Sequence, residues 1–166
     1  AKRKKDTVTA DSLKITVNGS FGKFGSKYSF LYSPDLLINT TITGQLTLLM
    51  LIEMITLSGG SVKSANTDGI VILCKRHNVQ AIRDTVSLFE LTTIFTMEYT
   101  EYRALYSINV NNYLAVKPDG TIKGKGQFAI GGLAKNPTNT ISVKAAIAYL
   151  TQQTPIKDTI LQCQDI

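Results

Sequence analysis

The chain has 166 residues, of which 43% are hydrophobic and 18% charged, and no long stretch is dominated by Gly, Pro or Ser. This composition is that of a globular protein and excludes a disordered or fibrous chain. Eighteen Lys and Arg against twelve Asp and Glu give a formal net charge of +6 at pH 7, which is a mild bias toward a polyanionic partner.

Neither cysteine belongs to a metal-ligand pattern. Cys74 and Cys163 lie far apart, and only His77 stands near one of them, in a run that predicts an exposed turn. A structural zinc site normally needs four ligands, so we expect two buried thiols in a reduced compartment.

The sequence predicts neither a membrane span nor a secretory signal. The most apolar run, Leu46 to Ile55, is interrupted by Glu53 and has roughly half the length of a span, so we expect a buried helix there. Lys2 to Lys5 lead into polar sequence and not into an apolar segment. We therefore expect a cytoplasmic protein with no membrane partner.

The first part of the chain predicts two helices and a hairpin. Spaced apolar residues indicate a helix over 6–22, which ends in a glycine-punctuated stretch. Ser33-Pro34-Asp35 predicts a turn inside irregular chain over 28–39. Helical spacing then indicates a long helix over 41–57. The short runs 62–65 and 70–73 follow it and predict a hairpin.

The second part predicts a further helix, a second hairpin and two closing helices. Apolar steps of three and four indicate an amphipathic helix over 78–91. A strand over 104–116 is expected to turn at Pro118-Asp119-Gly120 and to return over 121–128. A helix over 142–152 precedes Thr154-Pro155, where we expect another helix with Pro at its first position. This order predicts an α+β fold with an antiparallel sheet.

Lys14, Asn18 and Phe21 form the first candidate site. Steps of four and three residues place them on one face of the predicted helix, with Gly22 following. A cation, an amide and an aromatic ring suit a nucleoside triphosphate, because Lys attracts phosphate oxygens and a ring offers a flat surface to sugar and base. The alternative is a solvated lysine beside a glycine-rich helix end.

Asn66-Thr67-Asp68-Gly69 form the second candidate site. As a local pattern, Asn and Asp-Gly are what a tight hairpin turn favours. As a chemical pattern, a carboxylate at a hairpin tip is held rigidly and faces open space, which suits a metal ion. Both interpretations stay open at the level of local sequence.

Lysines alternate with glycines in the second predicted hairpin, after Asn111-Asn112-Tyr113. This pattern places amines on one face of a strand, and Gly124 and Gly126 let a phosphodiester backbone come close. The alternative is an exposed edge strand that uses lysine against aggregation. The candidate DNA-binding residues are Tyr113, Lys117, Lys123 and Lys125.

The first candidate site resembles the fingers motif of family B DNA polymerases. That motif consists of Lys, three residues, Asn, Ser, any residue, Tyr and Gly, and Lys14, Asn18, Phe21 and Gly22 fall on it in register. Gly19 replaces the Ser and Phe21 the Tyr. The resemblance implies that Lys14 neutralises the triphosphate, Asn18 hydrogen-bonds it, and Phe21 packs beneath the nascent base pair.

The tetrad 66–69 is similar to the Asp-Thr-Asp-Ser turn of the same family. One predicted helix separates it from the first candidate site. The resemblance implies that Asp68 is a Mg²⁺ ligand in a two-metal site. Asn66 stands where the family has its first Asp, and Gly69 where it has Ser; Thr67 matches. The family's other essential Asp lies upstream of the fingers, so we expect this chain to supply only part of the site.

The second predicted hairpin resembles the family's Lys-Lys-Arg-Tyr segment, which touches the primer. Tyr113 matches directly, whereas Asn111 and Asn112 replace basic residues. The resemblance implies three segments: the end of the fingers with the nucleotide motif over 1–25, the palm with its antiparallel sheet over 26–135, and the start of a helical thumb over 136–166.

The resemblance implies a part of a DNA-directed DNA polymerase. Its partners would be a DNA primer-template, deoxynucleoside triphosphates and an upstream polymerase segment with the exonuclease, the first palm motif and the fingers. We expect it in the cytoplasm of a bacterial or phage-infected cell, and inactive as an isolated chain. One alternative is a non-catalytic, nucleic-acid-binding palm-like subunit, and another is an unrelated basic domain in which both motifs are coincidences.

Overall fold

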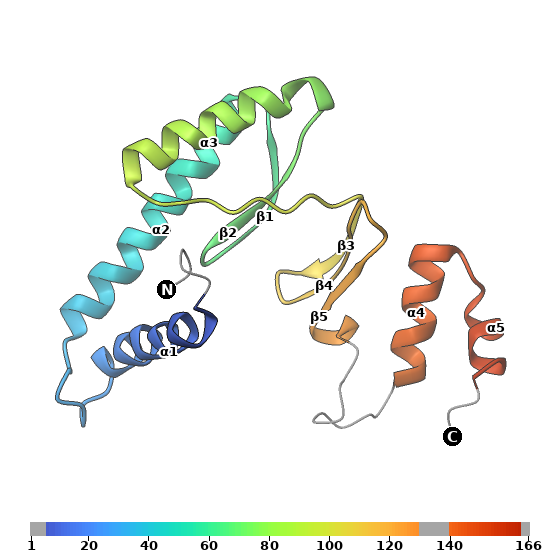
Figure 1. The fold of residues 1–166 in the computed structure, drawn as a ribbon, viewed down its shortest axis with the longest axis horizontal. Coiled ribbons are helices and arrows are strands. Elements are labelled where there is room, and N and C mark those ends of the chain that lie inside the picture. The colour runs from blue at the N-terminus through green and yellow to red at the C-terminus, as the bar shows by residue number, and fades with distance from the viewer. Residues whose placement is uncertain (1–5, 130–139, 164–166) are drawn as a thin grey trace. The chain divides into compact units, whose positions relative to one another are not determined.

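The computed structural model describes residues 6–129 and 140–163. Helices alternate with small antiparallel sheets, which confirms the predicted α+β class (Figure 1). The elements are α1 (Thr7–Phe24), α2 (Pro34–Leu57), β1 (Ser61–Asn66), β2 (Gly69–Leu73), η2 (Arg76–Asn78), α3 (Val79–Thr93), β3 (Ala104–Asn109), β4 (Asn112–Val116), β5 (Ile122–Lys125), η3 (Gly126–Phe128), α4 (Thr140–Gln152) and α5 (Ile156–Leu161).

The chain divides into two compact units, Ala1–Phe95 and Thr96–Ile166. The first contains α1, α2, the β1–β2 hairpin and α3, and the second contains the sheet β3-β4-β5 with α4 and α5. The predicted sheet is thus two separate antiparallel sheets, one in each unit. The predicted boundary at 25–26 stays a prediction, and the boundary at 135–136 lies outside the described residues.

The core of the first unit lies where α3 packs against the C-terminal part of α2. The predicted amphipathic helix is confirmed, because α3 buries Ile82, Val86 and Phe89 on one face. α2 contributes Leu51 and Ile55, which are almost completely buried. Burying side chains of this size stabilises the fold by about 1.5–3 kcal/mol each.

The helix α2 begins seven residues earlier than predicted. Ser33-Pro34-Asp35 is not a turn in irregular chain but the start of the helix, with Ser33 as the N-cap residue, Pro34 at the first position and Asp35 in the first turn. Pro fits there because its missing N–H would have no helical partner. The helix ends where Gly59 takes a φ of +84° and the amide of Gly60 donates to the carbonyl of Ile55 at 2.9 Å.

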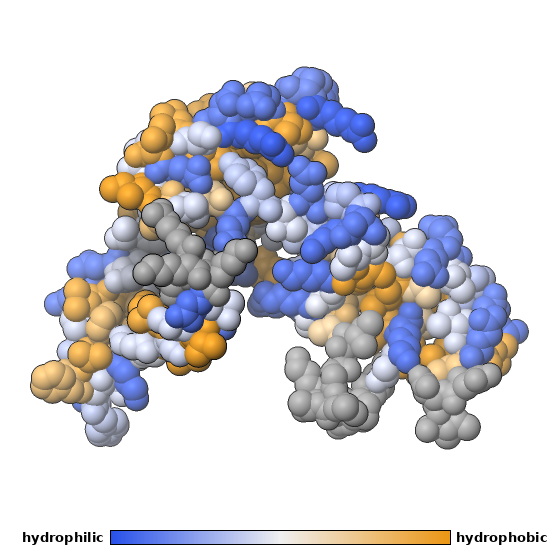
Figure 2. Space-filling model, in the orientation of Figure 1, coloured by the Kyte–Doolittle hydropathy of each residue, from blue (hydrophilic) through white to orange (hydrophobic). Residues whose placement is uncertain are grey.

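The N-terminal part of α2 is much more exposed than the predicted buried helix. Figure 2 shows apolar residues along α1 and this part of α2, and Leu46 is 60% exposed. The reason is that α3 covers only the C-terminal end of α2, around Leu51 and Ile55.

By length and composition α2 could cross a membrane, and 11% of its most apolar window is buried. A single helix of this kind is weak evidence for a membrane span, because the core helix of a soluble protein can be equally long and apolar. Its 24 residues would reach roughly 36 Å, somewhat more than the apolar thickness of a bilayer. The expected absence of a membrane partner therefore stays a prediction.

The second unit has its core between a three-stranded meander and α4. The predicted strand 104–116 is two strands, β3 and β4, because Asn109 turns the chain: its side-chain oxygen accepts hydrogen bonds from the Asn111 amide at 3.0 Å and the Asn112 side chain at 2.9 Å. Leu114 and Ala115 of the central strand are fully buried.

The helices of the second unit follow the prediction with one correction at α5. The hydroxyl of Tyr106 on β3 donates to the carbonyl of Leu150 at 2.7 Å, which ties α4 to the sheet. Pro155 is the N-cap of α5 and not its first helical residue, because its extended ψ of 135° lies outside the helical range. An open groove of about 470 Å³ runs between α4 and α5, and the buried hydroxyl of Thr159 lacks a hydrogen-bond partner there.

Neither cysteine forms a disulfide, and both are half-buried where the sequence predicts buried thiols. Cys74 lies between β2 and η2, next to the exposed turn that contains His77. Among residues 6–129 and 140–163, no three His, Cys, Asp or Glu side chains form a metal-binding group.

Candidate functional site

The helix α1 displays the residues of the nucleotide motif on its surface. Lys14, Asn18 and Phe21 share a face of this 18-residue helix, which has no buried residue. Phe21 is held by an edge-to-face contact with Phe24, at 6.3 Å between ring centroids and 78° between ring planes. The cation, the amide and the ring are therefore accessible to a ligand from the same side.

The start of α1 is fixed by a side-chain cap. The carboxylate of Asp6 accepts a hydrogen bond from the amide of Thr9 at 3.0 Å. Hydrogen bonds from the Thr9 side chain and then from its backbone amide hold the pKa of Asp6 below its ordinary value. Because α1 buries nothing, this cap and intrinsic helix propensity matter more here than in a packed helix.

Asp68 lies at the tip of the β1–β2 hairpin and is exposed. Asn66 pairs with Gly69 across the strands, so Thr67 and Asp68 form the two-residue turn. None of these four residues has a positive φ, so the turn is not of the primed type that an Asp-Gly pair favours. Gly69 is instead the first residue of β2, and space is open around the position of a Cβ there.

Asn66 closes this turn with its side chain. Its Oδ1 accepts hydrogen bonds from the Thr67 amide at 2.8 Å and from the Thr67 hydroxyl at 3.2 Å. The family resemblance implies that Asn66 is a neutral replacement of a carboxylate, and the structure gives it a local role in the turn. Asp68 follows Thr67 in this turn, and its carboxylate is exposed.

A magnesium ion fits this turn only in part. Mg²⁺ prefers oxygen ligands in octahedral geometry and is usually bound through one or two carboxylates together with substrate phosphates. The turn offers the carboxylate of Asp68, while the Oδ1 of Asn66 already accepts two hydrogen bonds. Asp68 could thus hold one position of an ion whose other ligands come from water, from the nucleotide or from another polypeptide.

The two motifs belong to elements that contact α2 at its two ends. The amide of Ser33 donates to the carbonyl of Phe24 at 3.0 Å, which joins the end of α1 to the start of α2. β1 follows α2 and contacts it. That Lys14 and Asp68 face one cleft stays a prediction.

The candidate DNA-binding residues of the second unit share one face of its sheet. Tyr113 is paired with Lys125, and Ala115 with Lys123, so these side chains alternate with the buried Leu114. The amine of Lys125 lies 5.9 Å from the centroid of the Tyr113 ring, a cation–π contact. The sheet thereby carries two amines beside an aromatic ring.

The turn between β4 and β5 carries Lys117, the remaining candidate DNA-binding residue. Lys117 donates its amide to the Thr121 carbonyl at 2.9 Å, and Gly120 takes a φ of +83°. The carboxylate of Asp119 accepts from the Thr121 amide at 2.8 Å. This hydrogen bond is the main reason that the pKa of Asp119 lies below its ordinary value; the Thr121 side chain and Lys117 also lower it.

Gly124 and Gly126 have a packing role within the second unit, whereas the approach of a DNA backbone there stays a prediction. A Cβ at Gly124 would overlap the carbonyl of Phe128, and a Cβ at Gly126 would overlap the carbonyl of Asn111. Gly126 also has a φ of +64°. These glycines are therefore required by the close packing of the chain on itself around η3.

The loop between α1 and α2 carries exposed aromatic residues that the sequence analysis treated only as irregular chain. Tyr28 and Phe30 are 101% and 103% exposed. The available signal was the alternation of aromatic residues with Lys27 and Ser29 directly after the nucleotide motif.

No protein-family model matches this sequence, and no curated protein is significantly similar to it.

Proposed function

We propose that this chain is the part of a family B-type DNA polymerase that contains the end of the fingers, the palm and the start of the thumb. The observation that carries the proposal is Asp68, an exposed carboxylate at a two-residue hairpin tip, one helix after a helix face with Lys14, Asn18 and Phe21. The order and the elements agree with the two motifs of that family, and so do the residue types at Lys14, Asn18 and Asp68.

In the proposed reaction, the primer 3′-hydroxyl loses its proton to water and its oxygen bonds to the α-phosphorus of a deoxynucleoside triphosphate. The bond from that phosphorus to the oxygen bridging to the β-phosphate breaks, and pyrophosphate leaves. Bound Mg²⁺ would stabilise the charge that develops on the attacking and leaving oxygens. Asp68 would hold part of this metal site, with a further Asp supplied by an upstream segment. Lys14 and Asn18 would bind the triphosphate, and Phe21 with the adjacent Gly22 would position sugar and base.

The second unit would bind the primer-template. Lys123 and Lys125 lie on one sheet face with Tyr113, and Lys117 follows at the β4–β5 turn. Each amine that neutralises a phosphate releases a counterion, so affinity should fall steeply as salt rises. The net charge of +6 supports this direction.

The decisive experiment is primer extension by this chain together with the upstream polymerase polypeptide, with Mg²⁺ and deoxynucleotides. Asp68→Ala should abolish extension and leave primer-template affinity within about two-fold, because only the metal-held transition state loses a ligand. Gly69→Ser is the matched control, since open space surrounds that position and the family has Ser there. Normal extension by Asp68→Ala would overturn the proposal.

A second candidate is a palm-like subunit that binds nucleic acid without catalysis. Asn66 favours it, because a neutral side chain engaged by Thr67 stands where the family has a carboxylate. Salt-sensitive primer-template binding without extension in any pairing would support this candidate over the first. Absence of such binding would contradict both.

A further inference from the structure

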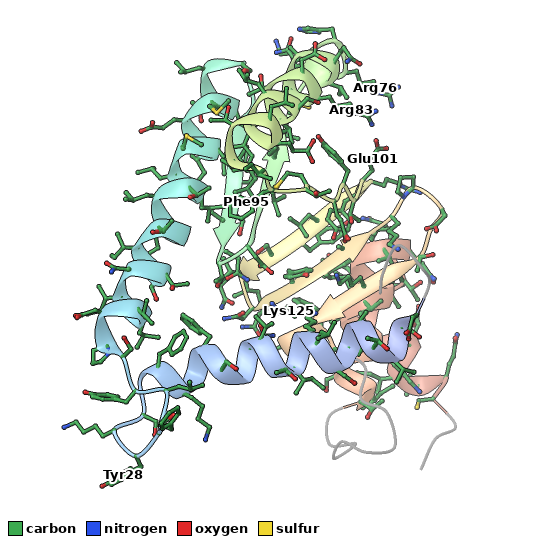
Figure 3. The ribbon with its side chains drawn as sticks, turned by 60° about the vertical axis from the view of Figure 1, so that its left-hand side comes forward. Tyr28, Arg76, Arg83, Phe95, Glu101 and Lys125 are labelled. Atoms are coloured by element: carbon green, nitrogen blue, oxygen red, sulfur yellow. The ribbon has the colours of Figure 1, made fainter. Side chains whose placement is uncertain are left out.

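The loop between α1 and α2 presents two aromatic rings that contact nothing in their own unit. Tyr28 and Phe30 are fully exposed, and Figure 3 shows Tyr28 at the outer tip of the loop, pointing away from both helices. Fully exposed rings forgo the burial that usually stabilises aromatic side chains. These two rings, two residues apart in one loop, are therefore available to a ligand with flat apolar surfaces.

The loop is held in shape by its backbone. The amide of Ser29 donates to Ser26 at 2.9 Å, the amide of Tyr32 donates to Ser29 at 3.0 Å, and Ser33 closes the loop on Phe24 at 3.0 Å. The hydroxyl of Ser29 also accepts from the amide of Leu31 at 3.1 Å. The rings are thus presented by an ordered turn, which lowers the entropy cost of binding.

The charge around the rings is positive. Lys23 ends α1 and Lys27 directly precedes Tyr28, and no acidic residue occurs between Asp11 and Asp35. Aromatic rings that alternate with amines can bind an anionic polymer that carries planar groups. Single-stranded nucleic acid has this chemistry, because unpaired bases stack on aromatic rings while amines contact the phosphates.

We propose that the α1–α2 loop binds single-stranded nucleic acid, with bases stacked on Tyr28 and Phe30 and phosphates contacted by Lys23 and Lys27. A duplex fits less well because its bases are already stacked on one another. An anionic membrane fits less well because stable attachment usually draws on a cluster of four to eight basic residues. The binding requires neither metal nor nucleotide, so it is independent of the proposed polymerase reaction.

The test is fluorescence anisotropy with a labelled oligothymidylate, in EDTA and without deoxynucleotides. Replacing both rings, Tyr28→Ser with Phe30→Ser, should weaken binding by about ten-fold per ring. Exchanging the rings, Tyr28→Phe with Phe30→Tyr, should keep wild-type affinity, because the stacking surfaces remain. Tyr149→Ser is the matched control, since Tyr149 is an exposed tyrosine on α4.

Salt dependence separates the two kinds of contact. Lys27→Ala should reduce the slope of log K against log salt by about 0.7, whereas the ring variants should leave the slope unchanged. Wild-type affinity in the double Ser variant would overturn the proposal.

Two further outcomes would also overturn it. One is binding of a hairpin duplex as tight as that of oligothymidylate, with the same loss in the double Ser variant. The other is a loss confined to binding of phosphatidylserine vesicles. Normal extension by Asp68→Ala would refute the polymerase reaction and leave the result for this loop unaffected.

Discussion

Asn66 is the residue at which this chain departs most from the chemistry of a two-metal site. Its amide oxygen organises the turn through Thr67, so a carboxylate at the same position could accept the same hydrogen bonds. The departure therefore changes the charge of the turn more than its shape. The proposed role of Asp68 is therefore tested by measuring whether the tip of the hairpin binds a divalent cation.

Asn66→Asp should strengthen cation binding at the turn. One further exposed charge about 4 Å from a divalent cation contributes about 2 kcal/mol, or roughly thirty-fold in affinity. Paramagnetic broadening by Mn²⁺ of the amide signals of residues 66–69 measures this without any other polypeptide. Asp68→Asn should remove the broadening, and equal broadening in the wild type and Asp68→Asn would contradict metal binding at this carboxylate.

Asp119 predicts a local acid response at the β4–β5 turn. Its pKa is lowered in the folded chain, mainly by the Thr121 amide, so the ionised form stabilises the turn at neutral pH. That contribution is present above the ordinary value of 3.8 and is lost as the pH falls through the lower folded value. The Thr121 amide signal should shift in this acidic window, and in Asp119→Asn the shift should disappear. A shift retained in that variant would assign the response to another group.

At the scale of elements, α1 is a helix whose stability does not come from burial. None of its residues is buried, its start is capped by Asp6, and Gly19 and Gly22 occupy interior positions. Glycine lowers helix stability because it has the greatest backbone freedom in the unfolded chain. Two glycines in an exposed helix therefore make α1 a weakly stable element.

Gly22→Ala should stabilise α1 by about 1 kcal/mol, since no atom lies within 4 Å of the position of the added Cβ. Hydrogen exchange of the α1 amides should slow by roughly five-fold. Gly19→Ala is the matched control with the same open space. If a nucleotide approaches the backbone at Gly22, only Gly22→Ala should weaken nucleotide binding; equal binding by both variants would contradict that contact.

At the scale of the whole molecule, each unit has its own core. Leu51 and Ile55 meet α3 in the first unit, and Leu114 and Ala115 are buried on the central strand of the sheet in the second. The lack of room for a Cβ at Gly60 shows how tight the first core is, because a Cβ there would lie 2.6 Å from Ile55 and 3.0 Å from Ile82. Damage to one core should therefore remain in its unit.

Ile55→Ala should destabilise the first unit by about 2–4 kcal/mol, because it leaves a cavity in a tightly packed core. Leu57→Ala, two residues later and 88% exposed, should change stability by less than about 0.5 kcal/mol. Amide exchange measures both, with loss of protection expected in α3 and not in β4. Equal loss in β4 would show that the two units unfold as one.

The sequence determined most of the elements through local patterns. The steps of three and four from Val79 to Phe89 predict the face that α3 buries, and the two runs around Asn66 predict the hairpin, because these signals arise from side-chain periodicity within one element. The same periodicity places Lys14, Asn18 and Phe21 on one helix face. Ser33-Pro34 predicts a turn but begins α2 in the structure, because the same residues favour a turn and a helix start.

Only the tertiary structure decided which surfaces are covered and which glycines are obligatory. Leu46 and Leu51 are equally apolar in sequence, yet α3 buries only the second, since burial depends on a neighbour from another element. In the sequence, Gly124 suits the close approach of a phosphate. In the structure, the carbonyl of Phe128 occupies the space that a Cβ of residue 124 would need. Contacts between residues distant in sequence leave no periodic signal. For the same reason, only the structure shows that no other element covers the rings of Tyr28 and Phe30.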